Sequence, residues 1–150
     1  MLLHGTCLSV GEAGVLLLGP PASGKSDLAL RLIDQGGGGI TGILKGAQLV
    51  ADDQVAIRLE NGRLLAAAPL AIAGRLEIRG LGLVALAHRG EVALTIAVRL
   101  TGLPSIERLP DIEKSRFEIL GVGLPMILVD PASASAPARI RAAVDWLHRA

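Results

Sequence analysis

The sequence predicts an α/β fold, in which a mixed β-sheet with flanking helices is built around a phosphate-binding loop. Residues 19–26 fit the pattern G-x-x-x-x-G-K-[ST], which forms such a loop when a strand precedes it and a helix follows. The apolar run Val15–Leu18 predicts the strand, and the helix formers of Asp27–Gln35, followed by a glycine, predict the helix. Further short apolar runs separated by turn residues predict more strands along the chain.

The loop itself predicts a site for nucleotide phosphates, formed by Gly19, Pro20, Pro21, Ala22, Ser23, Gly24, Lys25 and Ser26. Gly19 and Gly24 let the backbone turn tightly, so that its N–H groups and the helix N-terminus face one anion. Lys25 offers a positive charge to the β- and γ-phosphates, and Ser26 offers a hydroxyl to Mg²⁺. A glycine-rich turn that binds nothing is the alternative, and the strand and helix flanks disfavour it.

Length and composition favour a single domain over residues 1–150 and exclude several classes of protein. The chain is 51% hydrophobic but has only two aromatic residues of the Phe, Trp and Tyr types, Phe117 and Trp146, so the core must be aliphatic, with Trp146 expected to pack. With 15 Lys and Arg against 14 Asp and Glu, the net charge of +1 argues against a nucleic-acid partner. Cys7 is the only cysteine, no secretory signal is evident, and no apolar run approaches the roughly 20 residues that span a bilayer. We therefore expect a cytoplasmic protein without membrane or nucleic-acid partners.

The first elements are expected to form a hairpin that leads into the loop. Leu2–Val10 is predicted as a strand, and the turn residues of Gly11–Gly14 return the chain antiparallel into Val15–Leu18. The helix after the loop should end near Gln35. The glycine-rich stretch Gly36–Gly46 is then expected to form a solvated loop rather than a second phosphate site.

A pair of carboxylates follows the next predicted strand. Gln48–Ala51 is expected to be a buried strand beside the loop-leading strand, and it ends at Asp52 and Asp53. A P-loop enzyme needs carboxylates at such a strand end to hold Mg²⁺ or its waters. An ordinary Asp-rich turn is the alternative, and the phosphate loop upstream favours the functional interpretation.

The rest of the chain predicts further strands and one more helix. Asn61-Gly62 between two apolar runs is typical of a hairpin, and Gly102–Ser115 is typical of a surface loop. Ser133 or Ser135 is expected to cap a final helix that has Pro137 in its first turn. In all we expect about eight strands and two helices. The remaining strands are Leu76–Val84, as an edge strand that runs into a flexible turn, Glu91–Leu100, Phe117–Leu120 and Met126–Val129.

Four segments occur in the same order as in HPr kinase/phosphorylase, and the chain resembles that family from about residue 2 to about residue 130. The segments are His4-Gly5, Gly19–Ser26, Leu49–Asp53 and Leu76–Gly82, the last of which resembles the family's own signature. Taken alone, His4 has another interpretation, as a partly buried and hydrogen-bonded structural histidine. The resemblance covers the family's C-terminal catalytic domain and implies its fold, in the short form in which this domain stands alone.

The resemblance implies an ATP- and Mg²⁺-dependent kinase that phosphorylates a serine of HPr, or of an HPr-like phosphocarrier of the phosphotransferase system. Many members also catalyse the reverse phosphorolysis, and members form hexamers, so a homo-oligomer is expected. By their positions in the motifs, the catalytic residues would be His4, Lys25, Asp53 (the acceptor of the serine proton) and Arg108. The metal ligands would be Ser26, Asp52 and Glu77.

The resemblance leaves three properties undecided: phosphorylase activity, the substrate protein and the phosphoryl donor. The segment that the family uses for dephosphorylation has no arginine here, in Gly121–Pro125, so phosphorylase activity is undecided, as are the substrate protein and the donor, ATP or pyrophosphate. The loop also resembles that of adenylate-type kinases, which makes a small-molecule kinase an alternative, although the lid arginines of those enzymes are not evident. A nucleotide-gated sensor without turnover is the third candidate.

Overall fold

A computed structural model describes the chain except for residues 39–41, 43–44 and 150. The loop that we expect over Gly36–Gly46 lies partly outside these described residues. Within them there are two helices, α1 (Lys25–Asp34) and α2 (Ala136–Arg149), and eleven strands. The strands are β1 (Leu2–His4), β2 (Thr6–Val10), β3 (Ala13–Leu18), β4 (Ala47–Ala51), β5 (Gln54–Glu60), β6 (Arg63–Ala67), β7 (Arg75–Ile78), β8 (Gly82–Ala85), β9 (Val92–Leu100), β10 (Arg116–Ile119) and β11 (Val122–Val129).

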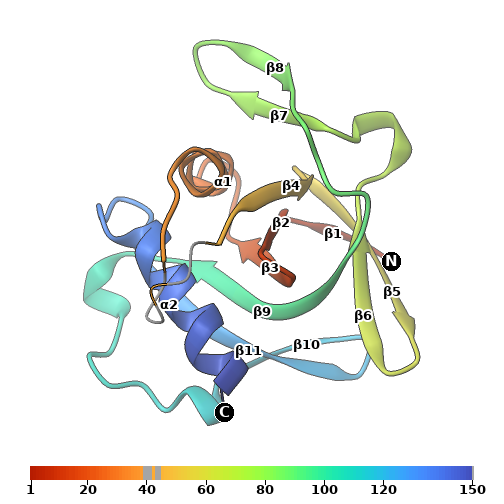
Figure 1. Cartoon of the computed structure of the whole chain (residues 1–150). Helices are drawn as coiled ribbons and strands as arrows, with labels where there is room; N and C mark the ends of the chain where they lie inside the picture. Colours follow the sequence, from red (N-terminus) through yellow and green to blue (C-terminus); the bar gives the residue numbers. More distant parts are fainter. Residues whose placement is uncertain (39–41, 43–44, 150) are drawn as a thin grey trace.

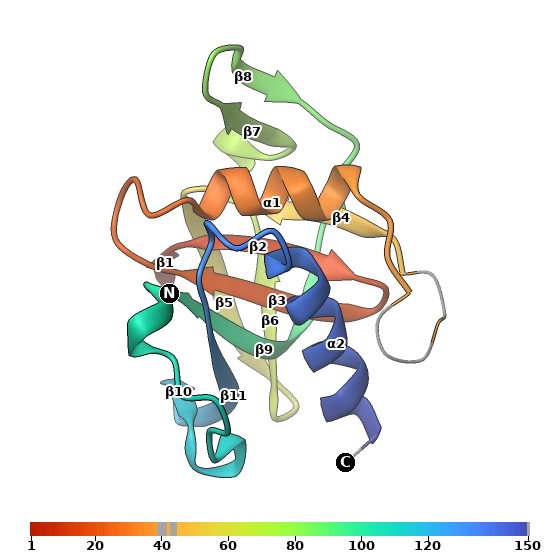
Figure 2. The ribbon, with the colours of Figure 1, turned by 90° about the vertical axis from the view of Figure 1, so that its left-hand side faces the viewer.

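Nine of these strands form one mixed sheet. Its order is β1-β5-β6-β9-β3-β2-β4, and β11 also pairs with β9, while β10 pairs with β11. The three strands β3, β9 and β11 are parallel, and the other pairings within this sheet are antiparallel. Figure 1 shows that the sheet curls strongly, and Figure 2 shows that both helices cover the same side of it. The predicted mixed α/β architecture with two helices is therefore confirmed.

Aliphatic side chains form two clusters on opposite sides of the central strands. The first lies under the helices and includes Leu28 and Leu32 of α1 and Ile140 of α2. The second joins the central strands to β5, β6, β10 and β11. Strand β9 supplies both clusters, since Val98 belongs to the first and its neighbour Ala97 to the second. Each fully buried Leu or Ile contributes about 1.5–3 kcal/mol to stability, so these clusters hold α1 firmly on the sheet.

A separate two-stranded hairpin, β7–β8, stands outside the main sheet. Figures 1 and 2 show it projecting beyond α1. Leu76 is fully buried in the cluster under the helices, whereas Leu81 and Leu83 are 77% and 69% exposed. Of the edge strand running into a turn that is expected over Leu76–Val84, the structure has β7 and the turn after it, where Gly80 and Gly82 adopt φ angles of 92° and 105°. The second strand of the hairpin, β8, and its separation from the main sheet were not predicted.

Several predicted boundaries also differ from the structure. The strand expected over Leu2–Val10 is broken at Gly5, whose amide donates a hydrogen bond to the carbonyl oxygen of Asp53 at 3.1 Å. Residues before Met126 belong to β11, because a turn at Leu120-Gly121 pairs them with β10. Trp146 is 54% exposed and does not pack as expected.

None of the described helices is long and apolar enough to cross a bilayer.

The expectation that β4 lies directly beside β3 is wrong, because β2 lies between them. A short turn brings β2 back along β3, and this pairing occupies the sheet edge that β4 would need. Since β4 is antiparallel to β2 and β2 is antiparallel to β3, β4 and β3 run in the same direction. The C-terminal ends of both strands therefore meet at one edge, which brings Asp52 and Asp53 to the loop after β3.

Candidate active site

The phosphate loop connects β3 to α1 with a backbone that specific residues make possible. Gly24 precedes α1 with φ 102°, and a Cβ there would lie 3.2 Å from a side-chain carbon of Pro131. A Cβ on Gly19 would lie 2.5 Å from the Ser23 hydroxyl oxygen. Ala22 has φ 63°, which is uncommon for a residue with a side chain. The loop is therefore a tight and partly strained structure that places the N-terminus of α1 at its mouth.

Lys25 closes this loop from the first position of α1. Its Nζ donates hydrogen bonds to the carbonyl oxygens of Gly19 at 2.8 Å and Pro20 at 2.9 Å, and lies 3.4 Å from the Ser23 hydroxyl. Burial lowers the pKa of Lys25, while the nearby carboxylates Asp52 and Asp53 oppose that shift. The ammonium is thus partly desolvated, which strengthens its interaction with an anion.

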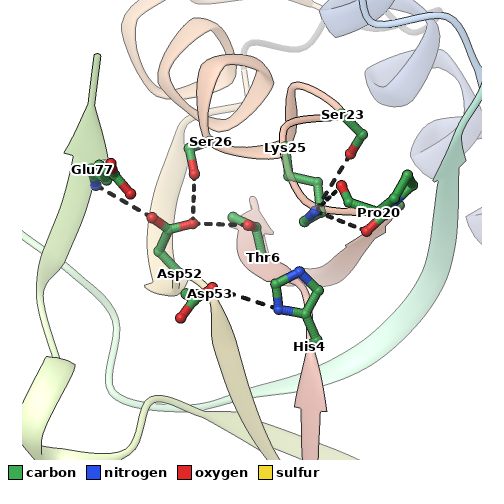
Figure 3. A network of polar contacts seen from close by, with 10 residues as sticks. His4, Thr6, Pro20, Ser23, Lys25, Ser26, Asp52, Asp53 and Glu77 are labelled. Atoms are coloured by element: carbon green, nitrogen blue, oxygen red, sulfur yellow. Dashed lines mark hydrogen bonds and ion pairs between the residues drawn. The ribbon is translucent and has the colours of Figure 1, made fainter. Parts of the chain in front are cut away.

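Asp52 connects the loop to two other elements (Figure 3). Its Oδ1 accepts hydrogen bonds from the hydroxyls of Thr6 and Ser26, each at 2.9 Å. Its Oδ2 accepts a hydrogen bond from the backbone amide of Glu77 at 3.3 Å. Asp52 is only 8% exposed. One buried carboxylate therefore joins β2, α1 and the β7–β8 hairpin at the point where β4 ends.

Asp53 lies in the turn between β4 and β5 and faces His4. The amide of Gln54 donates to the carbonyl oxygen of Asp52 at 2.8 Å, and Asp53 between them has φ 69°, as in a γ-turn. Its Oδ1 lies 3.5 Å from Nδ1 of His4, and both side chains are accessible, at 73% and 46%. Asp and Asn tolerate a positive φ better than most residues. The turn therefore directs the Asp53 carboxylate outward, in contrast to buried Asp52.

These groups surround one cavity of about 580 Å³, a size suited to a small-molecule ligand. The structure brings together nine of the predicted site residues at this cavity: His4, Pro21, Ala22, Gly24, Lys25, Ser26, Asp52, Asp53 and Glu77. The predicted loop residues Gly19, Pro20 and Ser23 do not line it. No group of three or more metal-ligating His, Cys, Asp or Glu side chains occurs among the described residues. Mg²⁺ typically uses one or two carboxylates and completes its shell with phosphates and water, and Ser26, Asp52 and Glu77 offer oxygens of this kind at the cavity. The donor set therefore fits a magnesium–nucleotide complex.

Comparison with known proteins identifies the family of the chain. The sequence model described as HPr Serine kinase C-terminal domain matches residues 1–144. The chain belongs to this HPr serine kinase family. It is 32% identical over 145 residues to HPr kinase/phosphorylase from Chromobacterium violaceum, covering 88% of this chain and 42% of the relative. It is 39% identical over 82 residues to HPr kinase/phosphorylase from Clostridium tetani, covering 55% of this chain and 24% of the relative.

A solved structure agrees with this membership of the HPr serine kinase family. The HPr(Ser) kinase/phosphatase from Coxiella burnetii superposes with a TM-score of 0.79 at 27% sequence identity, covering 99% of this chain and 90% of that chain. The chain spans less than half the length of the two curated relatives named above. The resemblance inferred from the motifs is confirmed, and the roles of individual residues stay predictions.

Arg108 is the one predicted catalytic residue that the structure does not bring to the cavity. It is exposed, in the segment between the short 3₁₀ helices Leu103–Ser105 and Ile112–Lys114, and it does not line the cavity. Five cavity residues are not in the predicted set: Thr6, Asp27, Leu30, Ile78 and Arg79. Thr6 and Arg79 each lie two positions after a predicted site residue, His4 or Glu77, so the period of two along a predicted strand could have indicated these two.

Proposed function

We propose that this member of the HPr serine kinase family transfers the γ-phosphoryl group of ATP, with Mg²⁺, to a serine hydroxyl of an HPr-like phosphocarrier. One observation carries the proposal: the phosphate loop with Lys25 and the outward carboxylate of Asp53 open into the same cavity. Phosphoryl transfer mainly requires that reactants are positioned and that charge on the transferred group is stabilised. The cavity supplies groups for both tasks.

The loop and Lys25 would bind the triphosphate. The N-terminal amides of α1 and the Lys25 ammonium all present positive charge at the loop mouth. In this structure the ammonium donates hydrogen bonds to the carbonyl oxygens of Gly19 and Pro20. On binding, phosphate oxygens would replace these acceptors, so the cation moves from the loop backbone to the ligand.

The cation site would use Ser26 and Glu77, supported by Asp52. These residues come from α1, β7 and the end of β4, and all three line the cavity. Bound Mg²⁺ supplies neutralisation of charge on the β- and γ-phosphates. The contribution of the chain is to hold these oxygen ligands beside the phosphate loop, in the cavity that Asp53 also lines.

Asp53 would act as the base for the incoming serine. A serine hydroxyl is a weak nucleophile until a base accepts its proton, and the Asp53 carboxylate is an accessible acid of the cavity that faces His4. His4, with Nδ1 at 3.5 Å, would orient that carboxylate. In the reverse direction the same carboxyl group would return the proton to the serine oxygen as inorganic phosphate takes the phosphoryl group.

The test is phosphoryl transfer from labelled ATP to a panel of HPr-like carriers, with phosphoserine located by mass spectrometry. The proposal expects Mg²⁺-dependent labelling of one serine in a carrier. Normal ATP binding without labelling of any carrier would contradict it, and labelling of nucleosides or sugars instead would support a small-molecule kinase. Added inorganic phosphate tests the reverse reaction, and pyrophosphate tests the alternative donor.

We also propose that the protein works as a homo-oligomer, a hexamer by family resemblance. Light scattering at several protein concentrations measures the assembly directly, and a monomeric mass throughout would contradict this part of the proposal.

A further inference from the structure

Thr6 is a cavity residue to which the proposed function gives no role. It is the first residue of β2 and is fully buried, yet its hydroxyl donates a 2.9 Å hydrogen bond to Oδ1 of Asp52. Where β2 pairs with β4, Cys7 lies opposite Ala51. One residue further toward the site, Thr6 at the start of β2 therefore faces Asp52 directly after β4. Figure 3 shows the Thr6 hydroxyl directed at the same carboxylate oxygen as the Ser26 hydroxyl.

These contacts use most of the hydrogen-bonding capacity of Asp52. A carboxylate has about four acceptor sites, and here three are taken by the Thr6 hydroxyl, the Ser26 hydroxyl and the Glu77 amide. Asp52 is buried, so water competes weakly for them. Thr6 itself is stiff, because a β-branched side chain on a paired strand has few rotamers. The carboxylate is therefore fixed from the strand side by a rigid donor.

This arrangement sets the direction in which Ser26 faces. A serine hydroxyl has one proton and two lone pairs, and an ionised carboxylate can only accept hydrogen bonds. The Ser26 proton therefore lies on the bond to Asp52, and its oxygen lone pairs are left for the cavity. A divalent cation needs this orientation, because it binds the oxygen and repels the proton.

We propose that Thr6 is a positioning residue, which holds Asp52 so that Ser26 presents its lone pairs to the cation bound with the nucleotide. The inference rests on the proposed function, since it concerns the same nucleotide site. It assigns Asp52 to the support of Ser26 and thereby separates its role from that of Asp53. Removal of the Thr6 hydroxyl should weaken the cation-dependent part of nucleotide binding and leave the cation-independent part intact.

The experiment measures ATP binding by calorimetry at a series of Mg²⁺ concentrations and in EDTA. Thr6→Val keeps the shape of the side chain and removes its donor, so the Mg²⁺ concentration for half-maximal enhancement should rise roughly 5- to 20-fold. ATP affinity in EDTA should stay within about twofold. Thr6→Ser keeps the hydroxyl and should restore the Mg²⁺ requirement to within about threefold of the unchanged protein.

Ser9→Ala is the matched control, because Ser9 is another buried hydroxyl residue of β2 and does not line the cavity. It should leave the Mg²⁺ requirement unchanged. If Thr6→Val weakens ATP binding equally with and without Mg²⁺, or lowers only the melting temperature, Thr6 is a core residue and the inference is overturned. Should Thr6→Val not fold, Thr6→Ala gives the same comparison. Absence of ATP binding by the unchanged protein would instead overturn the proposed function, and the role of Thr6 with it.

Discussion

The cavity has two walls that are attached to the protein in different ways. The α1 wall, with Lys25 and Ser26, rests on a buried cluster under the helices. The β7–β8 wall, with Glu77 and Arg79, is a two-stranded hairpin outside the main sheet, anchored in that cluster mainly through Leu76. Local opening requires less free energy where fewer apolar contacts are lost. We therefore expect the loop over residues 19–26, called the phosphate cradle below, to be fixed to the core. The β7–β8 hairpin that faces it is expected to open separately.

The largest expected effect is at Asp53, which lies between the two walls in the sequence order of the site, in the turn from β4 to β5. Asp53→Asn should lower phosphoryl transfer to the carrier by about 10²- to 10⁴-fold, because the amide cannot accept the serine proton. ATP affinity should remain within about twofold, since Asn also tolerates the φ of 69° at this position. Transfer is measured with labelled ATP and affinity by calorimetry. An equal loss of both would show that Asp53 is structural.

Cys7 probes the main sheet beside the cavity, because it lies on β2 and belongs to the second buried cluster. Burial raises the pKa of the Cys7 thiol from 9.0 to about 12, because the thiolate loses its hydration. At pH 8 the thiolate population should be roughly 10³-fold below that of an exposed cysteine, a difference that follows from about three pKa units. A thiol reagent should therefore label Cys7 only at the rate of global unfolding. Mass spectrometry measures the labelled fraction as a function of time. Fast labelling of the native protein would contradict the view that this part is rigid.

Two core substitutions compare the walls directly. Leu28→Ala in α1 should lower the free energy of unfolding by about 2–5 kcal/mol, as is usual for a fully buried leucine. Leu76→Ala should lower it less, about 1–2 kcal/mol, and should instead speed hydrogen exchange in β7–β8. Denaturant unfolding and hydrogen exchange by mass spectrometry measure the two effects. Equal losses of global stability would show that the hairpin is as firmly held as α1.

The smallest effect is expected at the outer face of the hairpin. Leu83 is 69% exposed, so Leu83→Gln should change the free energy of unfolding by no more than about 0.5 kcal/mol. Thermal unfolding of the Leu83→Gln and Leu76→Ala variants, measured under the same conditions, compares their losses of stability. A loss comparable to that of Leu76→Ala would mean that the outer face is covered in the assembled protein.

The locally encoded parts of the fold could be predicted from the sequence. Val15–Leu18, the phosphate loop and the following helix are specified by neighbouring residues, and the structure has β3 and α1 there. Asn61-Gly62 likewise specifies its own turn, with φ angles of 52° and 75°. In these segments periodicity, turn chemistry and helix propensity all favour the same structure.

The parts that depend on long-range pairing could not be predicted. The break at Gly5 exists because its amide bonds to Asp53, far along the chain, and nothing in the local sequence indicates that partner. The position of β2 between β3 and β4 is also a property of the whole sheet. For the same reason the motifs indicated nine of the residues around the cavity but gave no indication of the contact between Thr6 and Asp52.

The hydrogen bonds of Lys25 to its own loop carry a consequence for inhibitor discovery. Any molecule that occupies the cradle must draw the ammonium away from two carbonyl oxygens, at 2.8 Å and 2.9 Å. An uncharged fragment accepts weaker hydrogen bonds from the ammonium than an anion does. We therefore expect the hits of a fragment screen to be enriched in phosphonates, sulfonates and other small anions. Their apparent affinity should fall as ionic strength rises, which distinguishes hits in the cradle from those held by apolar contacts.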